Sequence, residues 1–133
     1  MHATLILAEA ATVHPDGTFS LIRGGLNEIK ASGFPAPFRG SLVVRVVAEP
    51  SEAGPHDFRI VLMNNDGREV MRIEGRFETQ SQVRFVHFCV QLGVMLPAPD
   101  RYGLRLTIDR LEVADWDLGA VLVSQPTPPM PPA

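Results

Sequence analysis

The sequence predicts an all-β domain, an antiparallel β-sandwich of about eight strands, and three observations support this. Stretches of alternating apolar and polar residues recur along the chain, as strands with one buried face require. Turn sequences rich in glycine, proline, asparagine and aspartate separate these stretches at intervals of roughly 8–12 residues. No stretch has the apolar spacing of an amphipathic helix. We expect an immunoglobulin-like arrangement or a close relative, with a jelly roll or a closed barrel as alternatives.

The N-terminal part predicts two strands joined by a turn. We interpret the apolar run Ala3–Thr12 as the first strand. His14–Gly17 predicts a turn, because proline presets φ and glycine accepts a positive φ. The second predicted strand covers Phe19–Lys30, and the pair Gly24 and Gly25 inside it predicts a bulge or a bend.

The middle of the chain predicts a central strand and a hairpin. After a proline-containing loop, Phe38–Ala48 has apolar residues on both faces and is therefore expected at the centre of a sheet. A fourth strand begins at His56 and Asp57, which should point to opposite faces because they are adjacent. Asn64–Gly67 is the strongest hairpin signal, since Asp-Gly suits a type I′ turn or a G1 bulge.

The C-terminal half predicts three more strands and a tail. Apolar and charged residues alternate over Met71–Glu78, whereas Val83–Val94 is apolar on both faces. The closing hairpin is predicted from Tyr102–Ile108 and Leu111–Leu118. We therefore expect one domain over residues 1–124 and a proline-rich tail over residues 125–133. The Pro-x-x-Pro repeats in Pro126–Pro132 could dock in an aromatic groove of a partner, or the tail could be a solubilising end.

Composition excludes several classes of function. The net charge of −3 and the pI of about 5.7 give no attraction to nucleic acid or acidic lipid. No run approaches the roughly 18 apolar residues of a membrane span, and the N-terminus lacks the basic residues of a secretion signal. The single cysteine, Cys89, allows no intrachain disulfide and fits a reducing compartment. We expect a cytoplasmic protein that binds neither nucleic acid nor membrane.

No pattern of residues predicts catalysis or a metal site. None of the four histidines has a recognised metal-ligand spacing, so no metal or cofactor is expected. His87 and Cys89 share one strand face, which suggests a Cys–His nucleophile, but their apolar flanks favour an inert thiol and a structural histidine. Four acids gather in the closing hairpin, and a solvated hairpin is favoured over a calcium or paired-carboxylate site because no EF-hand spacing is present. These acids are Asp109, Glu112, Asp115 and Asp117.

Two aromatic residues are the candidates for binding a ligand or partner. Trp116 is the only tryptophan and Tyr102 the only tyrosine. If exposed, either ring could stack on a sugar or anchor a partner, although alternation favours a core position for Trp116.

Three segments carry a family resemblance: ATLILAEAATVHPDGTFSLIRGGLNEI, HDFRIVLMNNDG and LPAPDRYGLRLTIDRLEVADW. They resemble a small bacterial family of uncharacterised β-sandwich domains, a domain of unknown function. Its members typically carry an aromatic residue after the glycine run, where this chain has Leu26. The resemblance covers most of residues 3–123 and implies the fold and a bacterial origin, but no activity and no site residue.

The sequence therefore predicts a non-catalytic binding or assembly module that engages a protein partner or a second copy through sheet faces and edges. One alternative is a carbohydrate- or small-ligand-binding sandwich that uses Trp116 or Tyr102. A weaker alternative is a small hydrolase with a polar pocket around His87.

Overall fold

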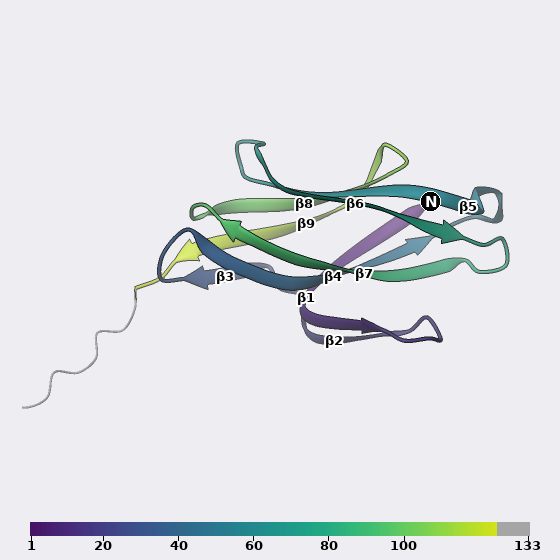
Figure 1. Cartoon of the computed structure of the whole chain (residues 1–133), viewed down its shortest axis with the longest axis horizontal. Helices are drawn as coiled ribbons and strands as arrows, with labels where there is room; N and C mark the ends of the chain where they lie inside the picture. The colour runs from purple at the N-terminus through teal and green to yellow at the C-terminus, as the bar shows by residue number, and fades with distance from the viewer. Residues whose placement is uncertain (125–133) are drawn as a thin grey trace, which may run out of the picture.

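The structure is a computed structural model that describes residues 1–124, and it confirms the all-β prediction. Within these residues, nine strands form two sheets (Figure 1). The strands are β1 (His2–Val13), β2 (Phe19–Gly24), β3 (Glu28–Ala31), β4 (Ala36–Val47), β5 (Gly54–Met63), β6 (Glu69–Thr79), β7 (Phe85–Leu96), β8 (Asp100–Ile108) and β9 (Leu111–Leu122). A single turn of 3₁₀-helix, η1, covers Pro50–Glu52. The predicted tail at residues 125–133, with its Pro-x-x-Pro repeats, lies outside the described residues.

The first sheet has the strand order β2-β1-β4-β7, and the second has the order β3-β9-β8-β5-β6. Neighbouring strands are antiparallel except β3 and β9, which are parallel, so the prediction of antiparallel pairing is wrong for this pair alone. The predicted second strand is in fact two strands. Arg23 and Gly25 have φ values of 50° and 91°, and there the chain leaves the first sheet and enters the second. The glycine pair thus marks a change of sheet rather than a bulge.

Strand β1 bends where it passes from one partner to another. Residues 2–8 pair with β4, whereas residues 8–13 pair with β2. The β1–β2 hairpin lies at the bottom of the view in Figure 1, beyond β4 and β7. Its tip reaches β7, because His87 Nδ1 donates to the carbonyl of Gly17 at 2.6 Å and the Phe19 ring stands edge-on to the His87 ring. The hairpin therefore covers part of the outer face of the first sheet.

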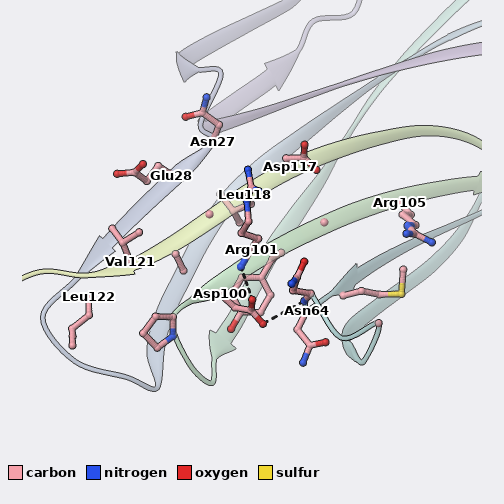
Figure 2. A pocket seen from close by; sticks show the side chains of 18 residues that line it. Asn27, Glu28, Asn64, Asp100, Arg101, Arg105, Asp117, Leu118, Val121 and Leu122 are labelled. Carbon is pink, nitrogen blue, oxygen red and sulfur yellow. Dashed lines mark hydrogen bonds between the residues drawn. The ribbon is translucent and has the colours of Figure 1, made fainter.

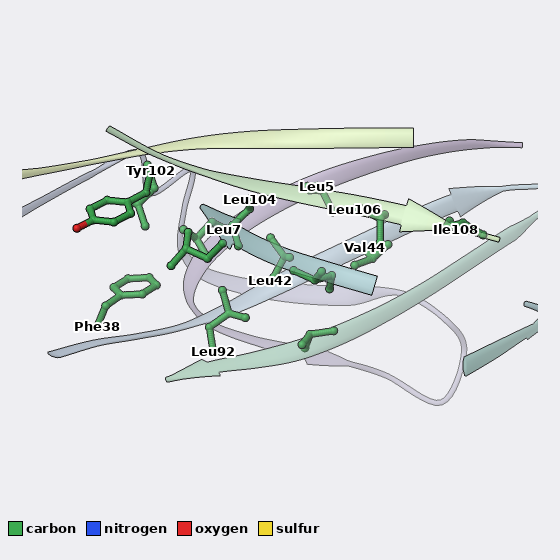
Figure 3. Packing of buried hydrophobic residues seen from close by; sticks show 14 of the residues in the cluster. Leu5, Leu7, Phe38, Leu42, Val44, Leu92, Tyr102, Leu104, Leu106 and Ile108 are labelled. Atoms are coloured by element: carbon green, nitrogen blue, oxygen red, sulfur yellow. The ribbon is translucent and has the colours of Figure 1, made fainter. Parts of the chain in front are cut away.

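The hydrophobic core lies between the two sheets (Figure 3). The central position predicted for Phe38–Ala48 is confirmed, since β4 lies between β1 and β7. Leu42 and Val44 point into the core and are fully buried, while Val43 on the opposite face is 1% exposed. Apolar side chains of both sheets complete the core: Leu5, Leu7, Leu92, Tyr102, Leu104, Leu106 and Ile108.

Both predicted hairpins are confirmed. At residues 64–67, Asn64 Oδ1 accepts hydrogen bonds from the backbone N–H groups of Asp66 and Arg68, and Gly67 has a φ of 81°. In the closing hairpin, Asp109 and Arg110 have φ values of 49° and 71°. Two successive positive φ values are typical of a type I′ turn, whose twist matches that of the flanking strands.

Candidate functional site

The outer face of the second sheet carries charged side chains in pairs. Arg59 lies 3.0 Å from Glu74, and Arg76 lies 2.8 Å from Asp57, measured between side-chain nitrogen and oxygen atoms. All four side chains are at least half exposed. Exposed ion pairs contribute little to stability, but they keep a sheet face in water. The charged side chains of this face are therefore solvated and form ion pairs with one another.

A polar groove lies at one end of this sheet (Figure 2). Strands β8 and β9, the turn at residues 64–67 and Asn27 line it. Asp100 is already engaged, because its carboxylate accepts hydrogen bonds from the backbone N–H groups of Arg101 at 2.7 Å and Asn65 at 3.3 Å. Within residues 1–124, the one buried side-chain polar atom without a hydrogen bond is His87 Nε2, outside this groove. The groove thus presents no buried unpaired group that would select a ligand.

The structure brings together three side chains that the sequence did not connect. Nδ1 of His56 lies 2.5 Å from Oδ2 of Asp109, and Nε2 of His56 lies 3.1 Å from the hydroxyl oxygen of Thr79. Asp109 is held in place, because its other oxygen accepts the backbone N–H of Asp57 at 3.0 Å. An acid, a histidine and a hydroxyl in this order resemble the connectivity of a hydrolytic triad.

The protonation state of His56 argues against catalysis. Its Nε2 lies 2.6 Å from the carbonyl oxygen of Glu52, which can only accept, and its Nδ1 faces the carboxylate of Asp109, which also accepts. With an acceptor facing each ring nitrogen, the geometry favours the doubly protonated, charged imidazolium. Burial lowers the pKa of His56, but the hydrogen bonds to Asp109 and to the Glu52 carbonyl, with the negative charges of both residues, raise it overall. An imidazolium cannot take a proton from a nucleophile.

Thr79 is also unsuited to act as a nucleophile. The residue is 4% exposed, and its hydroxyl donates to the carbonyl of Glu52 at 2.8 Å. The cluster instead connects η1, β5, β6 and the β8–β9 turn, and the His56 ring stacks on Phe77. We interpret the cluster as a structural cross-link at one end of the second sheet.

His87 and Cys89 lie on the outer face of the first sheet, as their spacing predicts, opposite Arg45 and Val43 of β4. The backbone carbonyl of Gly17, not an acid, accepts from Nδ1 of His87. Burial raises the pKa of the Cys89 thiol, which is the reverse of what a nucleophilic thiolate needs. The pair thus lacks both the orienting acid and the activated thiol of a Cys–His enzyme.

The two aromatic candidates both make internal hydrogen bonds. Tyr102 is 2% exposed, and its hydroxyl donates to the carbonyl of Ala98 at 2.5 Å. Trp116 is half-buried, and its indole N–H donates to the carbonyl of Leu26 at 2.7 Å. Of the hairpin acids, Asp109 contacts His56, and Glu112 lies 4.0 Å from Arg105. No three His, Cys, Asp or Glu side chains within residues 1–124 are grouped to hold a metal ion.

Strand β7 differs from the other strands at the sheet edges. It has the sequence FVHFCVQLGVML, with twelve residues and no aspartate, glutamate, lysine or arginine. The other edge strands are β2, β3 and β6. Strands β2 and β3 have only six and four residues, and β6 carries five charged residues among eleven. Phe85 and Met95, at the two ends of β7, are 46% and 54% exposed.

An edge strand presents backbone N–H and C=O groups that another chain can pair with. Proteins protect such edges with charged side chains, prolines or short strands, and β7 has none of these. Apolar residues on both faces are typical of a central strand, yet the structure places β7 at an edge, next to β4 only. This open edge is the candidate functional site. Sequence reasoning found the strand but could not find its position in the sheet.

The fold and this edge define an all-β domain of two sheets whose long, uncharged edge is free to pair. Residues 3–120 match the model of a family of unknown function, DUF6941, and the chain belongs to this family. Comparison with curated proteins and with solved structures gave no match. Among residues 1–124 there is no helix long and apolar enough to cross a membrane. The predicted membership of an uncharacterised family is thus confirmed, while the bacterial origin stays a prediction.

Proposed function

We propose that this domain is a non-catalytic binding module that engages a protein partner through the edge of β7. The observation that carries the proposal is the uncharged edge of twelve residues. In strand addition, an extended segment of the partner pairs with such an edge, and backbone hydrogen bonds supply affinity. Side-chain contacts at alternate positions then give specificity, and Phe85 and Met95 are exposed for that purpose.

We also propose that the domain is immunoglobulin-like, and the strand order supports this. A constant-type immunoglobulin domain has strands A, B, E and D in one sheet and C, F and G in the other. Strands β1, β4 and β7 have the order of A, B and E, while β5, β8 and β9 have the order of C, F and G. The hydrogen bond of Tyr102 at the start of β8, to a residue four positions upstream, matches the tyrosine corner of strand F.

This assignment gives a reason for the open edge. In the constant-type domain, strand D covers the free edge of strand E. Here β6 runs through a turn at residues 80–84 directly into β7, and no strand of the described residues takes the place of D. A partner strand bound at β7 would occupy that place.

The test compares two double variants of the full chain. F85K/M95K places charges on the edge of β7, and I22K/L122K is the control, because Ile22 and Leu122 are 61% and 59% exposed outside β7. Each tagged variant is expressed together with an untagged copy of the same variant in cells of the source organism, and proteins that co-purify are identified by mass spectrometry. We expect wild type and control to retain a specific protein, either another chain or the untagged copy, and F85K/M95K to lose it. Equal retention by all three would refute the proposal.

A further inference from the structure

We infer that the strand that pairs with β7 is β7 of a second copy, antiparallel to the first and related to it by a two-fold axis at Val90. This inference rests on the proposed function of the β7 edge. A two-fold axis perpendicular to a sheet makes the two edge strands antiparallel and puts the same surface of each copy in contact. The two four-stranded sheets would join into one continuous sheet.

The exposed apolar residues of β7, Phe85 and Met95, are placed symmetrically about Val90. In this register, residues equally far from Val90 in opposite directions face each other. Phe85 and Met95 lie five residues before and five after Val90, and they share one face of the strand. Phe85 of each copy therefore stands opposite Met95 of the other, where ring and sulfur make a favourable contact. Two side chains that are about half exposed in one copy become covered in the pair.

The absence of charged residues on β7 also favours pairing with a second copy. A two-fold axis sets a charged residue on the axis against its own copy, and like charges directly opposite destabilise a sheet. Strand β7 has no such residue. If β6 paired with itself about Glu74, that residue would face its own copy and Arg72 would face Arg76. Strand β7 can therefore pair with itself in any register without opposing like charges, whereas β6 meets that repulsion in the register about Glu74.

Gly93 on β7 also fits this pairing. Its φ is not positive, and a methyl group added at its Cα would meet no atom within 4 Å, so nothing in the described part of one copy requires a glycine there. In the proposed register Gly93 faces His87 of the other copy. The tip of the β1–β2 hairpin lies over His87, through Gly17 and Phe19. A glycine opposite His87 leaves space for that tip.

Disulfide crosslinking of single-cysteine variants tests the register. One variant is F85C/C89A and the other is M95C/C89A, so each chain has one thiol. Opposed residues of an antiparallel pair have Cα atoms about 4.5–5.5 Å apart, within the range that a disulfide spans. We expect mild oxidation to give a covalent dimer, of twice the chain mass of 14.6 kDa, when the variants are mixed. Each variant alone should stay monomeric on a non-reducing gel.

Absence of the covalent dimer from the mixture, or equal crosslinking of each variant alone, would overturn the inference. Light scattering provides a second measurement. F85K/M95K places lysine opposite lysine and should weaken the dimer about tenfold or more, whereas F85K/M95E places lysine opposite glutamate and should recover most of the loss. If these tests show no dimer but F85K/M95K still loses a different captured protein, the second copy is not the partner. The proposed function of the β7 edge would then still hold.

Discussion

Strands β6 and β7 follow each other in the chain, have 11 and 12 residues, and each lies at the edge of its sheet. Figure 1 shows them joined by one turn and running in opposite directions. Yet β6 alternates apolar residues with Glu and Arg, and β7 has no charged residue. A position at the edge of a sheet is therefore not sufficient for a strand to bind another strand. The edge must also lack the charges that keep other strands away.

The two strands share one corner of the core, and breaking that corner should have the largest effect. The ring centroid of Phe77 on β6 lies 5.3 Å from that of Phe88 on β7 and 6.3 Å from that of Phe58. Phe77 is 9% exposed, so Phe77→Ala should lower the free energy of unfolding by about 3–5 kcal/mol. Urea denaturation measures this change. Phe85→Ala is the control at concentrations where the chain is monomeric, with an expected loss under about 1 kcal/mol. Similar losses would contradict the assignment of Phe77 to the core.

The second prediction concerns a variant in which the middle of β6 lacks charge, as β7 does. Glu74→Val/Arg76→Val takes two charges from β6 and leaves apolar side chains in their place. Because residues 73–77 in the middle of β6 would then be uncharged and able to pair, we expect assemblies larger than a dimer, with a mass that rises with concentration. Light scattering measures it. Arg105→Val/Glu112→Val removes a similar pair from β8 and β9, away from the edges formed by β6 and β7, and should leave the mass unchanged. If the β6 variant also kept its mass, edge charge would not be what distinguishes β6 from β7.

The third and smallest effect is a pH dependence of stability caused by His56, which contacts Thr79 of β6. Because the pKa of His56 is raised above its ordinary 6.5, its contribution to stability is full below pH 6.5 and is lost as pH rises through the raised value. The hydrogen bond from His56 lowers the pKa of Asp109 below its ordinary 3.8, so the contribution of Asp109 persists until pH falls through that lower value.

We therefore expect the free energy of unfolding to fall by about 1.5–3 kcal/mol above neutral pH, which is the scale of a hydrogen bond to a charged group. Urea denaturation of wild type and of His56→Gln across this range measures it. The difference between the two proteins should shrink as pH rises. A difference that stays constant would show that His56 is uncharged in the folded protein.

Local patterns predicted most of the fold. Alternation identified strands such as β6 and β8, and the residues at 64–67 and 109–110 identified both hairpins, because a turn depends on a few neighbouring residues. The prediction of about eight strands missed one, since the glycine pair predicted a bulge or a bend within one strand and not a change of sheet.

The open edge of β7 and the His56 cluster were harder to predict, because each depends on contacts between distant residues. His56 and Asp109 are 53 positions apart, and no local spacing connects them. The apolar faces of β7 predict burial on both sides but not which strand lies beside it. The turn at residues 80–84 leads directly from one edge strand to another, and only the assembled sheets show this.

Amide hydrogen exchange at increasing protein concentration tests the central claim most directly, because one experiment observes both edges. Backbone N–H groups on the free side of β7 should exchange more slowly as concentration rises, while those on the free side of β6 should exchange at an unchanged rate. Slower exchange at β6, or no concentration dependence at β7, would contradict the claim that the uncharged edge of β7 pairs with a second copy.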